Sequence, residues 1–332
     1  MEEQPMSRAA RASDGRPWTR SRGVALILMA SLCLGAGAPL ARLASSTDPV
    51  LVAAARCAIA SAVLLLASPL EVLRLLTRAT ARQIALMAGA GLLLAAHFGF
   101  FLMGLAKTSI AAAVTLVSLE PFGVVLTAWL LSSCTPKRHE WVGLGVAVAG
   151  TLTLLVMGGG GTGDHRVSGD LLVLVSVFLW GFYLAAVRAN GHVERPSALG
   201  AIVFFAAAIL LGVAAFFRGA SFHLSGGAAL AILGLGLVPT LGGHTIVQWA
   251  TPHVKPSLIA LVSPGETVGA LFLAILLTSE RPSGLEMVGV CVVLAGAWWS
   301  IHGSGGRERR GGAGRVPAGA PRRDGRRPRE IP

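Results

Sequence analysis

Charged residues are scarce in this sequence. Asp, Glu, Lys and Arg make up only 13% of its 332 residues, whereas soluble globular domains contain about 25%. Hydrophobic residues account for 54%, and the mean hydropathy is +0.69. The segments that connect the apolar runs are short, which leaves no room for a soluble domain between them. The composition therefore excludes an ordinary soluble globular protein.

Several chemical signatures are also missing. No G-x-x-x-x-G-K-[ST] motif occurs, so the Gly-rich stretch 158–164 is not a phosphate-binding loop and nothing indicates ATP-driven chemistry. No H-E-x-x-H or G-x-S-x-G motif lies in an apolar run, which argues against an enzyme that works inside a membrane. The four cysteines form no C-x-x-C pair and are interpreted as small apolar side chains. Neither a metal nor another cofactor is expected.

Long apolar runs fill most of the chain. Crossing a bilayer as a helix takes about 20 residues, and ten runs of about that length are predicted at 23–42, 50–69, 83–106, 109–131, 141–157, 169–187, 197–217, 226–250, 255–278 and 285–301. The Arg-rich start and Ala36-Gly37-Ala38 imitate a signal peptide. However, Arg42 and another apolar run follow at once. The sequence therefore predicts an all-α membrane protein with ten transmembrane helices.

Positive charge is concentrated at the two ends of the chain, and the net charge is +12. Ten spans place both termini on one side, and 22 of the 28 Lys and Arg residues then fall on that side, five on the other, and Arg56 within a span. The positive-inside rule predicts cytoplasmic termini in a multi-pass cell (inner) membrane protein. The basic segments 1–22 and 302–332 are expected to be cytoplasmic, the latter disordered, and no nucleic-acid partner is expected.

The second half of the chain repeats the first. A shift of 146 residues pairs Glu120 with Glu266 and Arg42 with Arg188, and a shift of 147 pairs His97 with His244. We interpret 158–168 as a linker between repeats at 23–157 and 169–301. Each repeat has five spans, an odd number, so the second copy must be inverted. Inverted repeats are typical of secondary transporters, whose sites lie near the midplane beside broken helices.

Three segments resemble the drug/metabolite transporter superfamily in its EamA-type ten-helix branch. They are AKTSIAAAVTLVSLEPFGVVLTAWLL (106–131), TPKRHEWVGLGVAVAGTLTLL (135–155) and LIALVSPGETVGALFLAILLTSERPSGLEMVGVCVVLAGAW (258–298). The resemblance covers about 23–301. A glutamate commonly ends the fourth helix of each repeat in such proteins. Glu280 fits this pattern, whereas Cys134 stands at the equivalent place in the first half. The resemblance implies movement of small metabolites, often amino acids, driven by an ion gradient or by exchange.

Glu120 and Glu266 stand at matching depths inside apolar runs. An ionised group there costs about 2.5–3.5 kcal/mol on insertion scales, so such residues usually face a cavity. A carboxyl group that can change protonation is what proton coupling requires. The alternative is a protonated glutamate that bonds a neighbouring helix. Pro121 and Pro264 lie beside them and are expected to break the helices and free the carbonyls of Val117 and Ala260. Ordinary kinks are the alternative.

Other polar residues in the spans are weaker candidates. His97 and His244 could carry protons or bind substrate, or could be structural. Gln248 lies one turn after His244 on the same face. Arg56 could pair with a substrate carboxylate or extend to the membrane interface. Trp180 and Tyr183 could wall a pocket, or they could pack against other helices or belong to an aromatic belt at the membrane interface.

We therefore predict a secondary transporter of small organic metabolites, with export favoured by the resemblance and one midplane site. The alternatives are a receptor or scaffold that transports nothing and, less favoured, an intramembrane enzyme. The expected partners are a small-molecule substrate and the lipid bilayer. The sequence leaves open whether the chain acts alone or as a homodimer.

Overall fold

The described chain is a bundle of helices. A computed structural model describes residues 20–132, 138–157, 164–190, 196–221, 224–251, 259, 262–278 and 280–302, and these contain helices and connecting segments but no strand. The helices are α1 (Arg20–Gly35), α2 (Gly37–Leu43), α3 (Pro49–Ala67), α4 (Pro69–Arg78), α5 (Ala81–Leu105), α6 (Ile110–Val117), α7 (Glu120–Ser132), α8 (Arg138–Met157), α9 (Asp164–Ala189), α10 (Pro196–Phe217), α11 (Gly226–Leu235), the π-helix η1 (Gly236–His244), α12 (Thr245–Ala250), α14 (Val262–Leu277) and α15 (Gly284–His302).

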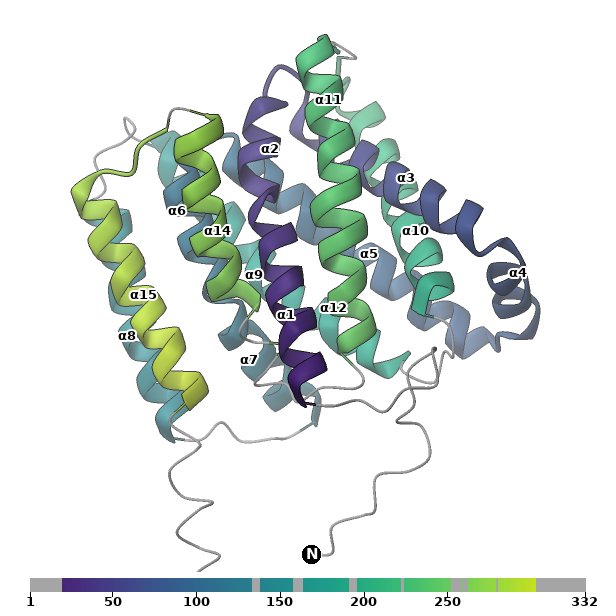
Figure 1. Cartoon of the computed structure of the whole chain (residues 1–332), viewed down its shortest axis with the longest axis horizontal. Coiled ribbons are helices and arrows are strands. Elements are labelled where there is room, and N and C mark those ends of the chain that lie inside the picture. Colours follow the sequence, from purple (N-terminus) through teal and green to yellow (C-terminus); the bar gives the residue numbers. More distant parts are fainter. Residues whose placement is uncertain are drawn as a thin grey trace, which may run out of the picture.

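Seven stretches in the described part are long and apolar enough to cross a membrane. They are Ser21–Leu43, Pro49–Ala67, Ala81–Leu105, Ile110–Leu131, Val167–Ala189, Pro196–Phe217 and Gly226–Ala250. The all-α membrane class is therefore confirmed. Helices α8, α14 and α15 occupy the three remaining predicted runs, and the count of ten spans stays a prediction. The described chain begins in α1 and ends in α15 at the same end of the bundle (Figure 1).

Helix starts follow local capping chemistry. The Asp48 carboxylate accepts hydrogen bonds from the backbone N–H groups of Val50 and Leu51 at 2.9 and 3.2 Å, and Pro49 occupies the first helical position of α3. Thr80 and Gln83 form a capping box at α5. These residues satisfy donors that would otherwise have no partner at a helix N-terminus.

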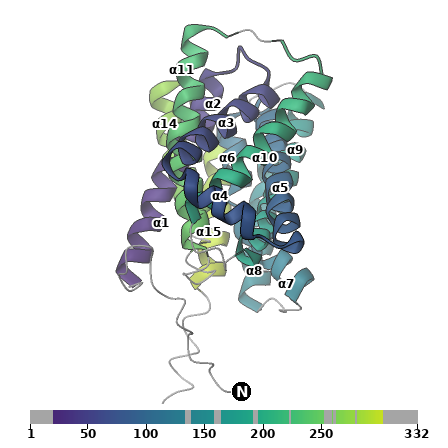
Figure 2. The same cartoon turned by 90° about the vertical axis from the view of Figure 1, so that its right-hand side faces the viewer.

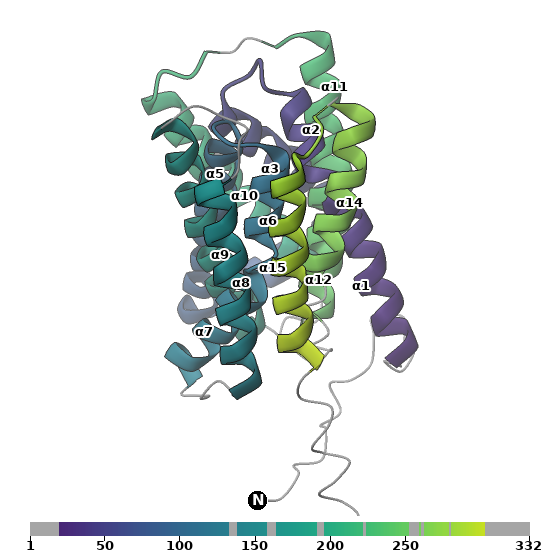
Figure 3. The ribbon, with the colours of Figure 1, turned by 90° about the vertical axis from the view of Figure 1, so that its left-hand side faces the viewer.

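Helices from the two halves of the sequence interleave. Helix α5 packs on α9, α3 on α10, α1 on α14 and α8 on α15, so each pair takes one member from each half. Figure 1 shows α8 and α15 together at one edge of the bundle. Figures 2 and 3 show the same bundle from its two sides.

Two glycine contacts reflect the sequence repeat. A Cβ at Gly35 would lie 3.1 Å from the backbone of Gly269, and a Cβ at Gly181 would lie 2.5 Å from the carbonyl oxygen of Gly123. The 146-residue shift converts Gly35 into Gly181 and Gly123 into Gly269. The two contacts are therefore equivalents of each other, as a two-fold relation between two copies requires.

Three of the long helical stretches are interrupted. The chain turns at Ala36 between α1 and α2, and at Ser118–Leu119 between α6 and α7, so that Glu120 and Pro121 begin α7. The third interruption is η1, which has Pro239 inside it and was not expected from the sequence. Pro264, which was expected to break a helix, lies in the first turn of α14. Ala260, whose carbonyl it was expected to free, falls outside the described residues.

Helix α4 was also not predicted. It joins α3 to α5 where the sequence indicated a connecting segment with Arg74 and Arg78 (Figure 2). Leu70 and Leu73 are exposed on it, and Val72 is buried against the bundle. An amphipathic helix between two membrane spans is suited to lie at the membrane surface.

Candidate functional site

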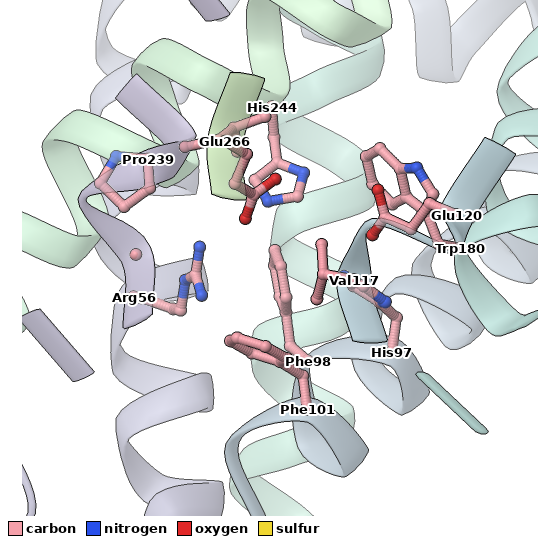
Figure 4. A pocket seen from close by; sticks show the side chains of 12 residues that line it. Arg56, His97, Phe98, Phe101, Val117, Glu120, Trp180, Pro239, His244 and Glu266 are labelled. Carbon is pink, nitrogen blue, oxygen red and sulfur yellow. The ribbon is translucent and has the colours of Figure 1, made fainter. Parts of the chain in front are cut away.

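A central cavity lies between the two halves of the bundle. Its walls come from α1, α2, α3, α5, α6, α7, α9, η1 and α14, and the lining residues are Leu34, Gly37, Arg56, His97, Phe98, Phe101, Val117, Glu120, Trp180, Pro239, His244 and Glu266 (Figure 4). Its free volume is about 20 Å³, close to the room that one water molecule needs. A metabolite would therefore require the walls to move apart.

Arg56 provides the positive charge of this cavity. It is buried in α3, and its Nε donates a hydrogen bond of 2.7 Å to Thr240 Oγ1 of η1. The guanidinium carbon lies 4.0 Å from the centre of the Phe98 ring, a cation–π arrangement. These contacts hold the group inside the protein, so Arg56 does not extend to the membrane interface. Figure 4 shows its guanidinium directed into the cavity.

Aromatic and imidazole rings form one wall of the cavity. The Trp180 ring centre lies 5.2 Å from the ring centres of both His97 and His244. The Phe98 ring centre lies 4.8 Å from that of His244. His97 Nδ1 lies 2.9 Å from the carbonyl oxygen of Ser176, so in the neutral form this nitrogen carries the proton. His244 Nδ1 is buried without a hydrogen-bond partner. A ligand with a polar hydrogen or an acceptor would give it one.

Glu120 and Glu266 reach the cavity from opposite halves (Figure 4). Ser263 of α14 donates a hydrogen bond to Glu120 Oε2. Glu120 is only 4% exposed, whereas Glu266 is partly exposed and interacts electrostatically with Arg56. The two glutamates also repel each other when both are ionised. Equivalent positions in the repeat thus have different surroundings.

Further hydrogen bonds fix the crossing of α6 and α14 beside the glutamates. The hydroxyl oxygens of Ser118 and Thr267 are 2.6 Å apart, and Thr267 Oγ1 also lies 2.8 Å from the Val114 carbonyl oxygen. Each hydroxyl has a partner from the other half, so these hydrogen bonds join the two halves close to the glutamates in the sequence. All three residues are buried.

Tyr183 and Gln248 lie beside the cavity rather than in its lining. The Gln248 amide donates a hydrogen bond to the Tyr183 hydroxyl, and both side chains are buried. The Tyr183 ring centre is 5.1 Å from that of Trp180, so the pair supports the aromatic wall. Six of the eight site residues proposed from the sequence therefore line one cavity, and the other two contact or extend its wall.

Several lining and supporting residues had no usable signal in the sequence. Phe98 and Val117 are apolar residues in apolar helices, and Thr240 and Ser263 are small polar residues of a kind common in membrane spans. The dipeptide Pro239-Thr240 between glycines was the one hint of irregular structure at η1. Proline within a helix and π-helical turns often mark functional sites.

Metal-ligating side chains do not gather in the described part. Within residues 20–302, apart from the undescribed gaps, no group of three His, Cys, Asp or Glu residues is close enough to hold an ion. The chemistry of the cavity is that of one guanidinium, two carboxyl groups and two imidazoles in an aromatic setting. Such a set can bind a small polar molecule.

A buried polar cavity between the repeated halves of a helical membrane protein defines a membrane-transport class of architecture. The family model of the EamA-like transporter family matches residues 21–156 and 167–301, one match for each half. The chain therefore belongs to the EamA-like transporter family, and through it to the drug/metabolite transporter superfamily.

A solved structure described only as a crystal structure of a protein has the same overall fold. It is 22% identical in sequence, its TM-score is 0.61, and the match covers 85% of this chain and 97% of that one. At this identity the likeness shows the fold alone. A comparison with curated proteins found no match.

Proposed function

We propose that this chain is a secondary active transporter that carries small organic metabolites, such as amino acids, through alternating access around the central cavity. The observation that carries the proposal is the convergence of Arg56, Glu120 and Glu266 on one cavity with walls from both halves. Charged groups at this depth are costly and are retained where they act on a substrate or an ion.

The substrate would be held by opposite ends of the cavity. The Arg56 guanidinium is fixed by Thr240 and Phe98 and suits a carboxylate or another anionic group. An amine on the substrate would meet the glutamates and the face of Trp180. His97 and His244 would supply hydrogen bonds, and the Tyr183–Gln248 pair would keep the aromatic wall in place.

Coupling to protons is assigned to the two glutamates. Two carboxyl groups in one desolvated cavity resist ionising together, so release of one proton is linked to the arrival of a cation or a substrate amine. Export is the direction that we favour. The chain would have ten spans in two inverted repeats, 23–157 and 169–301, in the inner membrane, with both termini in the cytoplasm.

Counterflow in liposomes tests this function. Purified full-length protein is reconstituted with an unlabelled amino acid inside, and uptake of the labelled compound is followed after dilution. A thermal-shift screen against amino acids and related metabolites selects the compound first, since a ligand that binds only the folded state raises its stability. Accumulation of label above equilibrium supports a transporter. Ligand binding with no counterflow of any binder would support the receptor alternative, and chemical conversion of a binder would support an enzyme.

A further inference from the structure

We propose that Arg42 and Glu280 form an ion-pair latch that closes the non-cytoplasmic end of the transport path and must open once in each transport cycle. The inference rests on the proposed function and topology. Arg42 Nε lies 2.6 Å from Glu280 Oε1. Arg42 stands near the end of α2 in the first half, whereas Glu280 follows α14 in the second half. The pair therefore joins the halves at the end of the bundle opposite to the start of α1 and the end of α15 (Figure 1).

Backbone groups extend the latch. Arg42 Nη2 donates a hydrogen bond of 2.6 Å to the carbonyl oxygen of Thr108, and Glu280 Oε2 accepts one of 3.2 Å from the N–H of Ile110. Thr108 Oγ1 in turn donates a hydrogen bond of 2.6 Å to Asp170 of α9. The connection between α5 and α6 is thus held by both members of the ion pair. Separating the halves at this end would break the ion pair, the Ile110–Glu280 hydrogen bond and the Thr108–Asp170 hydrogen bond together. The Arg42–Thr108 hydrogen bond lies within the first half and would remain.

A second cavity places the latch beside the route to the central site. Its free volume is about 110 Å³, and its lining residues are Ala41, Arg42, Ala44, Ser45, Thr47, Pro49, Val52, Leu102, Leu105 and Ala106. Val52 and Leu102 belong to this outer cavity, whereas Arg56 and Phe98, four residues away on the same helices, line the central cavity. The two cavities therefore follow each other along α3 and α5, and Arg42 stands in the wall of the outer one.

Partial exposure makes the latch reversible. The Arg42 and Glu280 side chains are 23% and 35% exposed, so water can solvate both charges when they separate. A fully buried pair would resist opening, because an unpaired charge would be left in a dry environment. A pair that water can reach changes the balance between two states by a small factor. That is the behaviour expected of a contact that opens during each cycle.

The sequence repeat predicts no matching latch at the other end. In the 146-residue repeat, Arg188 is the position equivalent to Arg42, and Cys134 is the position equivalent to Glu280. Arg188 is present near the end of α9 and exposed, but its equivalent partner carries no charge. An inverted repeat would place this incomplete pair at the cytoplasmic end. The latch therefore biases the protein toward the state that is closed on the non-cytoplasmic side.

Cysteine accessibility tests the latch without any need for a substrate. Val117, in the central cavity, is changed to cysteine in full-length protein that has no other cysteine. A membrane-impermeant maleimide is then added from the non-cytoplasmic side. We expect Arg42→Gln and Glu280→Gln each to raise the labelling rate about fivefold, the scale of one partly exposed ion pair. The double variant should label no faster than either single variant, because both substitutions remove the same contact. Labelling from the cytoplasmic side should not rise.

Arg281→Gln is the matched control, because Arg281 is an exposed arginine next to Glu280. Gln variants that fold normally and label at the control rate would overturn the latch.

Should the single variants misfold, the exchange Arg42→Glu with Glu280→Arg is measured instead. If the exchanged variant folds again and its cysteine is labelled as slowly as in the control, the latch is supported. If the exchange restores neither folding nor slow labelling, the latch is overturned. Counterflow of the latch variants that keep Val117 and the native cysteines separates the two proposals. Absent transport in these variants and in the wild type, with faster labelling in the cysteine series, rejects only the function. Transport with unchanged labelling rejects only the latch.

Discussion

Ser263 of α14 donates a hydrogen bond to the carboxyl group of Glu120 in α7, and this bond joins the two halves of the protein at the centre of the bundle. In the 146-residue repeat, Val117 is the position equivalent to Ser263, and Glu266 is the position equivalent to Glu120. The equivalent contact in the other half would therefore set Val117 against Glu266. Valine has no donor, so the duplicated site is chemically asymmetric at the position of its two acids.

This asymmetry gives a first prediction. Ser263→Ala removes the donor from a buried carboxyl group, which costs about 1–3 kcal/mol when the group is left unsatisfied. We expect a lower melting temperature and a counterflow rate reduced about tenfold. Ser61→Ala is the control, because Ser61 Oγ donates only to the Ala201 carbonyl oxygen at another helix contact. An equal loss of transport in both variants would show that Ser263 matters for packing alone.

A second prediction concerns proton coupling. Glu120→Gln keeps the shape of the side chain and its capacity to hydrogen-bond, but it cannot titrate. The variant should insert, fold and still exchange substrate, while uphill transport driven by a pH gradient is lost. Glu266→Gln should show the same defect, more weakly. Flux is measured in liposomes with and without the gradient. Wild-type uphill rates in both variants would reject coupling and leave Glu120 as a helix-packing residue.

A third prediction separates the charge of Arg56 from its geometry. Arg56→Lys keeps the positive charge but removes the planar guanidinium group. The guanidinium of Arg56 lies over the Phe98 ring and donates a hydrogen bond from Nε to Thr240, and lysine cannot make both contacts. We expect KM for counterflow to rise about tenfold with the maximal rate less affected. Thr240→Ser keeps the hydroxyl group and should behave like the wild type, whereas Thr240→Val should raise KM. An unchanged KM in Arg56→Lys would mean that the substrate does not contact the guanidinium.

A fourth prediction tests the topology. A reporter that is active only in the cytoplasm should work when fused after Ile301 and fail when fused within residues 158–163, since five spans would separate the two sites. The charge count of the sequence favours the same orientation. Equal activity at both sites would show that the span count is wrong. The measurement needs only membrane fractions with matched expression.

The class of the fold could be predicted from the sequence because the bilayer imposes strong rules. Long apolar runs must be helices, and the 146-residue offset alone relates Glu120 to Glu266. The offset does not say which positions meet across the two-fold axis. Contacts such as Ser263–Glu120 join positions that are not equivalent, so they depend on how the helices pack in three dimensions.

Irregular elements follow less directly from the sequence than the long helices do. Pro121 predicted a break in its helix, and the chain turns nearby at Ser118–Leu119. The π-helix with Pro239 was missed because a π-helical turn has no composition that distinguishes it from a kinked α-helix. The sequence permits two interpretations of Arg56, because the direction of its side chain depends on Phe98 and Thr240, which come from other helices.

The last prediction concerns the close approach of α7 and α9. A Cβ added at Gly181 would lie 2.5 Å from the carbonyl oxygen of Gly123, and 2.7 Å from Thr127 Oγ1. Backbone cannot yield as a flexible side chain can, so Gly181→Ala must push the helices apart, and overpacking of this kind costs about 1–3 kcal/mol. We expect a lower melting temperature in detergent and reduced counterflow, because the α9 wall with Trp180 would shift. Gly89→Ala is the control, since Gly89 also lies inside a helix but a Cβ there meets nothing within 4 Å. Alanine is the better helix former by about 1 kcal/mol, so the control should be neutral or slightly stabilised. A Gly181→Ala variant that melts at or above the temperature of Gly89→Ala would show that the two helices are not in the close contact described.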